Sequence, residues 1–310
     1  MSGTLGIAIR RRLFGIHARE ATFARRRFEP TSPDRQARLE LVGLTFVGGY
    51  NAYLADQLDE QVRSTSPELQ GFAVEGAAMA CAILDYVTPW RRDRHAALLE
   101  RLPEHRYMIY VGAGWATARL HGSLFRAVTR RDPLLGWLVA DGWGFHQAYF
   151  HPTRWATGAR ALPESDGYAR RAVDQGIGRA LWFIAGADPD RVAGRIGQFA
   201  ADRRGDLWSG IGLAATYAGG APREDLLRLA ELAGAHRADV AQGAAFAATA
   251  RAVANNVAPH VEVASQVLGG CAAAELASVS RSLEPRPTST TAYEDWRRDL
   301  RHAFTARVAA

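Results

Sequence analysis

The stretch DLWSGIGLAATYAGGAPREDLLRLAELAG, residues 206–234, has the pattern of one complete helical hairpin. Its first helix is expected from about Leu207 to Ala218. Gly219 and Gly220 would end that helix, because glycine tolerates the left-handed backbone that closes many helices. Pro222 suits the first turn of a second helix, in which three leucines recur at helical spacing. The stretch therefore predicts helix, break and helix in one unit.

Glycines that mostly follow a polar residue recur along the chain at nearly the length of this hairpin. They are Gly43, Gly76, Gly112, Gly142, Gly176, Gly210 and Gly243, with spacings of 33, 36, 30, 34, 34 and 33 residues. A period in this range is typical of stacked two-helix units. We therefore predict an all-α protein of about seven two-helix repeats.

Each repeat glycine is followed by small residues on the same helix. Two positions on stand Ala78, Gly114, Gly144, Gly178, Gly212 and Ala245; four positions on stand Val47, Ala80, Ala116, His146, Ala180, Ala214 and Ala247. Glycine inside a helix costs about 1 kcal/mol relative to alanine, so its repeated use indicates close backbone contact between neighbouring first helices. Such tight packing favours an inner layer that curls around a central cavity, with the second helices outside it. An open, curved α/α solenoid is the alternative.

The two ends of the chain differ from the repeats in residues 31–282. Residues 1–30 form a basic, amphipathic arm in which Arg10–Arg12 and Arg25–Arg27 alternate with apolar side chains. The arm is expected to pack across the repeats with solvated arginines; contact with a membrane surface or an acidic partner is the alternative. Residues 283–310 form a linker and an amphipathic helix that caps the repeat body.

The composition narrows the partners and the compartment. All 38 basic residues are arginine, the net charge is +6 and the pI is about 9.7, but beyond the arm the arginines alternate with acidic residues. No continuous basic stripe results, so nucleic acid is not expected as a partner. Cys81 and Cys271 form no CxxC pair, and the chain shows neither a long apolar run nor a signal-peptide layout. We expect a cytoplasmic protein, with peripheral membrane contact through the arm as the alternative.

His146 is the first candidate catalytic residue, because it replaces a small residue of the packing pattern. It lies in DGWGFHQAYF, residues 141–150. An imidazole on an inner face would serve as a general acid or base. A buried, hydrogen-bonded histidine that fills a gap is the alternative. His151 points to another face of a helix, so the two do not form a metal site.

The residues directly before the repeat glycines form the second candidate set: Glu75, Asp141, Gln175, Ser209 and Gln242. By repeat equivalence they should lie near the starts of successive inner helices and converge on one rim of the cavity. There Glu75 and Asp141 would act as acid and base, orient hydroxyl groups or bind a cation. Capping of the helix starts is the alternative, and is the expected role of Ser209.

The densest polar cluster is AADRRGDLWSG, residues 200–210. Asp206 is a candidate acid in it, and Arg203 and Arg204 are candidates for binding an anion or carboxylate of the substrate. Gln175, Arg179 and Gln242 are further candidates for binding the substrate. The alternative is an Arg–Asp network that braces one repeat against the next, with Asp174 and Arg179 pairing across units.

Tryptophans on the first helices are candidates for lining an apolar pocket: Trp115, Trp143, Trp182 and Trp208. Plain core packing is the alternative. GxSxG, Walker A, HExxH and a strand-framed GxGxxG are absent, as are the DDxxD and DxDD motifs of terpene cyclases and prenyltransferases. We therefore expect no cofactor and no metal.

Five segments carry a resemblance to a known family: GFAVEGAAMA (71–80), VGAGWATARL (111–120), DGWGFHQAYF (141–150), DQGIGRALWF (174–183) and RRGDLWSGIGLA (203–214). Through them the chain resembles, over nearly its whole length, the bacterial family known as domain of unknown function 1702. Members look like components of actinobacterial clusters for enediyne-type polyketides. The resemblance implies a role after or beside an iterative polyketide synthase that makes a linear polyene, and it carries over no catalytic residue.

We therefore expect a protein that binds a long, unsaturated, apolar intermediate and converts it by proton transfer, isomerisation or cyclisation. His146 would act together with Glu75, Asp141 or Asp206. The rival hypothesis is a non-catalytic protein that sequesters the polyene or tethers the polyketide synthase and other biosynthetic enzymes.

Overall fold

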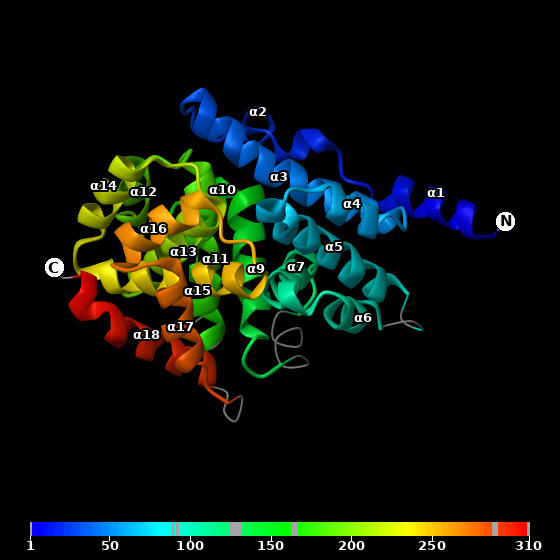
Figure 1. Cartoon of the computed structure of the whole chain (residues 1–310). Coiled ribbons are helices and arrows are strands. Elements are labelled where there is room, and N and C mark those ends of the chain that lie inside the picture. The colour runs from blue at the N-terminus through cyan, green and yellow to red at the C-terminus, as the bar shows by residue number, and fades with distance from the viewer. Residues whose placement is uncertain are drawn as a thin grey trace.

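The computed structural model describes residues 2–88, 90, 93–123, 132–160, 162, 167–286 and 291–308, without the side chains of residues 2–5. Within these ranges the regular elements are all helices, which confirms the all-α prediction. They form one helical body from which the N-terminal helix extends (Figure 1).

Seven of the described helices carry the repeat glycines and form the inner layer. They are α3 (Pro33–Leu54), α5 (Pro67–Val87), α7 (Arg106–Arg119), α9 (Trp137–Phe150), α11 (Tyr168–Ile184), α13 (Ala201–Ala218) and α15 (Arg237–Val253). Each packs against the next along the chain, and Figure 1 follows them from blue α3 to yellow α15.

The second helices of the units are shorter and lie outside this layer. They are α4 (Leu58–Ser64), α6 (Arg94–Arg101), α10 (Pro152–Trp155), α12 (Pro189–Ile196), α14 (Arg223–Ala233) and α16 (Pro259–Gly269). Helix α14 packs against both α12 and α16. The second helix expected in the third unit falls at residues 124–131, outside the described residues.

Glycine seams hold the inner helices close together. A Cβ atom on Gly176 would lie 1.9 Å from the carbonyl oxygen of Asp141 on α9, and one on Gly178 would lie 2.1 Å from that of Leu207 on α13. The two glycines of one helix therefore contact opposite neighbours. Because any larger residue would push the backbones apart, these contacts confirm the close approach predicted from the small residues.

The inner layer closes into a ring. On α3, Nε of Arg38 donates to the carbonyl oxygen of Ala218 at the end of α13, at 2.8 Å. Asn256, just after α15, donates to the carbonyl oxygen of Pro67 at the start of α5, at 2.9 Å. Arg251 on α15 donates to backbone carbonyls of both α5 and α13. The first two inner helices thus contact the last two, which decides between the ring and the open solenoid.

The inner helices begin earlier than the sequence pattern indicated. Helix α13 begins at Ala201 instead of about Leu207, so the residues before the repeat glycines lie at mid-helix. The predicted capping role of Ser209 is therefore wrong, because its Oγ donates to Oε1 of Gln242 on α15, at 2.7 Å. The Arg-rich segment before Leu207 is helical because its arginines find carboxylates and carbonyls on neighbouring segments.

The N-terminal arm starts with α1 (Ser2–Phe14), which extends away from the ring (Figure 1). Ile9 and Leu13 on this helix are 49% and 68% exposed. In the described residues, no helix is both long and apolar enough to cross a membrane.

The rest of the arm packs across the repeats, as expected. It comprises the 3₁₀ helix η1 (Ala18–Ala21) and α2 (Phe23–Arg26). Phe28, which follows α2, packs edge-on against the ring of Tyr149 on α9, with centroids 4.9 Å apart. This part of the arm is therefore joined to the inner layer by an apolar contact.

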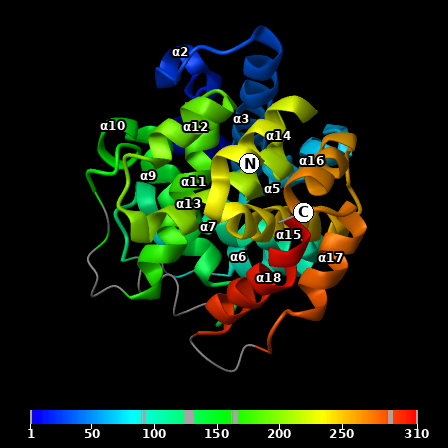
Figure 2. The ribbon, with the colours of Figure 1, turned by 90° about the vertical axis from the view of Figure 1, so that its left-hand side faces the viewer.

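The C-terminal helix α18 (Ala292–Val308) matches the amphipathic helix predicted within residues 283–310. It packs against α15, and α17 (Ala273–Ser282) lies beside both (Figure 2). Trp296 is buried, and its Nε1 donates to the carbonyl oxygen of Ser280 on α17, at 2.9 Å. Tyr293 of α18 faces the ring interior, so the helix covers one side of the central space.

Candidate functional site

The inward faces of the inner helices surround a cavity, here named the aromatic cavity. It lies between α3, α5, α7, α9, α11 and α13, with the half-buried Ile16 and Glu20 of the arm at its edge. Its aromatic lining is Phe46, Phe72, Trp115, Phe145, Tyr149, Phe150, Phe183 and Tyr217. The space between atoms is about 730 Å³, including the part open to solvent, and about 60 Å³ of it admits the centre of a water molecule. The cavity is therefore narrow and suits a thin or flat apolar ligand.

One position of the repeat supplies much of this lining. Three residues after the repeat glycines stand Phe46, Met79, Trp115, Phe145, Arg179, Leu213 and Phe246. All seven line the aromatic cavity or a second cavity beside it. Arg179 is the one charged residue among them. This position was not singled out in the sequence, although six apolar residues and one arginine in the same register were a readable signal.

Glu75 on α5 places a carboxyl group deep in the aromatic cavity. Its side chain is 4% exposed, and its Oε1 lies 4.0 Å from Nη2 of Arg179. Burial raises the pKa of Glu75 to about 7; the carboxylate of Asp141 adds to this effect, whereas Arg179 and the Trp115 indole oppose it. A carboxyl group with this pKa exchanges its proton near neutral pH.

Arg179 joins Glu75 to a chain of polar side chains that crosses the ring. Its Nη1 donates to Oδ1 of Asp141, and Oδ2 of Asp141 accepts from Nε2 of Gln175 at 2.8 Å. Gln175 also donates to the hydroxyl group of Tyr293 on α18, at 3.2 Å. Although burial opposes it, the carboxylates of Asp141 and Glu75 raise the pKa of Arg179 above its ordinary value. Arg179 is therefore a permanent cation beside Glu75.

The structure brings together the candidates that precede the glycines. Ser209 links Gln242 to Gln175, whose Oε1 lies 3.4 Å from Oγ of Ser209. All five side chains of this set are buried. They meet in the ring interior and not on a rim, because the glycines they precede lie at mid-helix.

His146 lies outside the cavity lining. It packs on α9 against Trp115 and Phe150, with ring centroids 5.7 and 4.7 Å apart. Burial, aided by nearby basic side chains, lowers its pKa to about 3. Its Nδ1 has no hydrogen-bond partner among the described residues. A neutral imidazole in this position is not placed to exchange a proton with a ligand in the aromatic cavity.

The four candidate tryptophans have different surroundings. Trp115 lines the aromatic cavity. Trp143 packs edge-on against Trp155 at 5.2 Å between ring centroids, and Nε1 of Trp182 donates to a backbone carbonyl at 2.9 Å. Trp208 is buried in the core. In the described residues, the last three lie outside the lining of both cavities.

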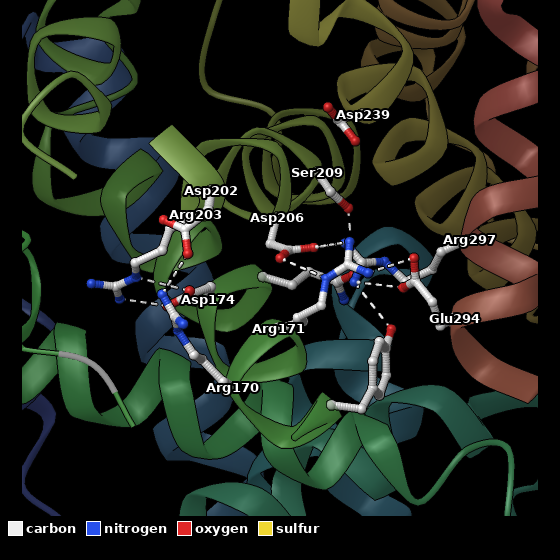
Figure 3. Close-up of polar contacts among 12 residues, drawn as sticks. Arg170, Arg171, Asp174, Asp202, Arg203, Asp206, Ser209, Asp239, Glu294 and Arg297 are labelled. Atoms are coloured by element: carbon white, nitrogen blue, oxygen red, sulfur yellow. Dashed lines mark hydrogen bonds and ion pairs between the residues drawn. The ribbon is translucent and has the colours of Figure 1, made fainter. Parts of the chain in front are cut away.

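Asp206 belongs to a set of polar contacts between α11, α13 and α18, here named the polar seam (Figure 3). It comprises Arg171, Asp174, Arg203, Asp206, Glu294 and Arg297. Asp206 accepts from Nε of Arg171 at 3.1 Å and from Nη2 of Arg297 at 2.7 Å. Its carboxylate therefore ties the capping helix to two inner helices.

The two candidate arginines are also engaged within the protein. Arg203 forms a two-pronged pair with Asp174 on α11, with Nε 2.9 Å from Oδ2 (Figure 3). Arg204 donates to the backbone carbonyls of Phe199 and Gly197, at 3.0 and 2.9 Å. Neither lines the cavities found in the described residues, so this cluster favours the bracing interpretation. Among the residues that the structure describes, no three His, Cys, Asp or Glu side chains are placed to hold a metal ion.

These elements define a class: a closed ring of two-helix repeats around an apolar, aromatic-lined cavity with a buried carboxyl group. The chain belongs to the family described as "Protein of unknown function (DUF1702)", whose model matches residues 5–304. This confirms the resemblance read from the five sequence segments. No match was found among curated proteins or among solved structures.

Proposed function

We propose that this protein binds a linear, unsaturated, apolar small molecule in the aromatic cavity and converts it by proton transfer through Glu75. One observation carries the proposal: a carboxyl group with a pKa of about 7 lies in a narrow cavity whose other lining is mainly aromatic and aliphatic. Perturbed acids in concave apolar sites are candidates for general acid–base catalysis. Glu75 takes the role first given to His146.

The lining supports an unsaturated ligand. Rings tilted against one another follow along the wall: the ring centroids of Phe46 and Trp115 lie 4.5 Å apart, and those of Trp115 and Phe145 lie 5.0 Å apart. Flat π-faces at these spacings pack well against a conjugated chain. The polyene as ligand, and the placement beside an enediyne-type polyketide synthase, come from the family resemblance and are part of the proposal.

The chemistry follows from the charges beside Glu75. As a carboxylate, Glu75 removes a proton from a carbon next to the conjugated system, and the resulting protonated acid returns it at another carbon of that system. Atoms and electrons balance, so an isomerisation or a ring closure needs no oxidant. Arg179 lies beside Glu75 and stabilises negative charge that develops on a polar group of the ligand.

Absorption spectroscopy tests this proposal directly, because moving a double bond shifts the absorption of a polyene. The polyene released by the cognate synthase is added to wild type, Glu75→Gln and His146→Phe. We expect wild type and His146→Phe to change the spectrum, with a rate that rises through about pH 7. Glu75→Gln should bind the polyene and leave its spectrum unchanged. Full conversion by Glu75→Gln would refute the role of Glu75.

The rival function, binding without conversion, is favoured by a separate observation. Most buried polar groups at the ring centre, including Asp141 and Gln175, are bonded to other protein groups. This alternative predicts a bound polyene, visible by native mass spectrometry, whose spectrum wild type never changes. It also predicts that partner biosynthetic enzymes copurify with the protein.

We further propose that α1 contacts an anionic membrane surface. The exposed Ile9 and Leu13 lie four residues apart on this helix, and Arg11 and Arg12 beside them are exposed. A basic helix with exposed apolar residues suits the boundary between lipid headgroups and chains. Since α1 leads into Ile16 at the edge of the aromatic cavity, this contact would bring the cavity close to a source of apolar ligand.

A further inference from the structure

A second cavity lies beside the aromatic cavity, toward α15 and the capping helix α18. Its lining includes Leu138 of α9, Phe246 and Ala247 of α15, and Tyr293 and Trp296 of α18. The space between its atoms is about 500 Å³, including any part open to solvent. It too is mainly apolar, and the polar chain that includes Asp141 reaches its wall.

Three side chains line both cavities: Arg179 from α11, and Leu213 and Tyr217 from α13. A single layer of side chains therefore separates the two spaces. Arg179 is held in this layer by Asp141, and Tyr217 lies under the guanidinium group of Arg251, 3.8 Å from the ring centre. Leu213 is half-buried and has no polar group to hold it. It is the part of the partition that can change rotamer at low cost.

We propose that the two cavities are compartments of one site, and that a long linear polyene passes Leu213 to occupy both. This inference rests on the proposed function and deepens it. Oε1 of Glu75 lies 4.0 Å from Nη2 of Arg179, and Arg179 borders both compartments. A ligand that spans the partition therefore presents an internal carbon to Glu75, not a chain end. The substrate class is a linear conjugated chain that reacts near its middle.

Two alanines at equivalent repeat positions provide a matched test. Ala214 lines the aromatic cavity, Ala247 lines the second cavity, and both are buried. Leucine at either site fills part of one compartment only. Affinities for an all-trans dienoic acid and an all-trans hexaenoic acid are measured by quenching of tryptophan fluorescence. Thermal unfolding of each variant confirms that it is folded.

We expect Ala247→Leu to weaken binding of the hexaenoic acid at least tenfold and to leave the dienoic acid unchanged. Ala214→Leu should weaken both. Unchanged hexaenoic acid affinity in Ala247→Leu would overturn the single-site inference while leaving the proposed function intact. If wild type bound neither acid, the proposed function itself would fail.

Leu213 gives a second test that does not depend on overfilling a compartment. Leu213→Ala opens the partition and should tighten binding of the hexaenoic acid relative to the dienoic acid. Leu213→Trp narrows the partition and should weaken the hexaenoic acid alone. Parallel changes for the two acids in both variants would show that the chain does not cross the partition.

Discussion

The polar seam and the aromatic cavity share the inner helices α11 and α13, yet Asp206 of the seam and Glu75 of the cavity differ in how closely arginines approach their carboxyl groups. In the seam, Asp206 accepts hydrogen bonds from two arginines, one on α11 and one on α18. In the cavity, Glu75 has one arginine 4.0 Å away, and that arginine is already bound to Asp141. Burial removes the water that would hydrate both carboxylates. Only at Asp206 do short hydrogen bonds from arginines compensate for this loss.

This difference shows that the repeat position of an acid does not decide its chemistry. Glu75 and Asp141 both stand directly before a repeat glycine, yet Asp141 accepts from Arg179 and Gln175 while Glu75 faces the aromatic cavity. What separates them is the number of donors that neighbouring helices supply. A carboxyl group left with few donors in an apolar cavity keeps a raised pKa, and so becomes available for proton transfer.

Asp206→Ala should have the largest effect on stability. It leaves the fully buried Arg297 without its closest carboxylate, so we expect a loss of about 3–5 kcal/mol in the free energy of unfolding. Urea denaturation followed by circular dichroism measures this. Asp202→Ala is the matched control, because that side chain is 62% exposed in its pair with Arg170 and should cost below about 1 kcal/mol. Equal losses would contradict the bracing role of the seam.

Glu75→Gln should have the next largest effect, and its size should depend on pH. Because the folded state raises the pKa of Glu75 from 4.5 to about 7, wild type loses stability as the pH rises through this interval. The glutamine variant lacks this loss. Between about pH 4.5 and pH 8, stability should therefore shift by roughly 3 kcal/mol in favour of the variant. Urea denaturation across this range is the measurement, and a pH-independent difference would count against a buried, titrating Glu75.

His146→Phe should give a smaller change in stability, with the opposite dependence on pH. The folded state lowers the pKa of His146 from 6.5 to about 3, so wild type loses stability as the pH falls below about 6.5. The variant should gain roughly 2–3 kcal/mol relative to wild type between about pH 7 and pH 4.5. The same denaturation series measures both histidine and glutamate variants. Identical pH slopes for wild type and His146→Phe would mean that the imidazole is not kept neutral.

Neutralising Arg11 and Arg12 together should have the smallest effect on the stability of the ring. The double variant, Arg11→Gln with Arg12→Gln, should unfold like wild type and bind phosphatidylserine vesicles roughly 30-fold more weakly, at about 1 kcal/mol for each arginine. Cosedimentation with vesicles measures this. Arg10→Gln is the control, because Nη2 of Arg10 already donates to Asp56 at 2.6 Å. Absence of vesicle binding by wild type would remove the proposed membrane contact.

Much of the fold could be predicted because its strongest signal is local. Gly176 and Gly178 stand in a helix that would be more stable with alanine, so their recurrence has to reflect close contact with neighbours. The candidate site was found in part for the same reason, since repeat equivalence pointed to Glu75 and Asp141 together. The packing pattern did not show that His146 lies outside the lining of the aromatic cavity, because an exception to a packing pattern carries no information about access to a cavity.

The sequence by itself thus determined the helical repeats, the inner helices and the set of polar residues that precede the repeat glycines. Only the tertiary structure decided that the ring closes, that the carboxylate of Asp206 is paired with two arginines and that Glu75 keeps a raised pKa. The reason is that these contacts join residues far apart along the chain. Asp206 pairs with Arg171 and Arg297, which lie 35 and 91 residues away in the sequence. Ring closure depends on the contact of Arg38 with Ala218 of α13, 180 residues away. Periodicity reports neighbours along a helix, whereas pairing of buried charges depends on which distant helices meet.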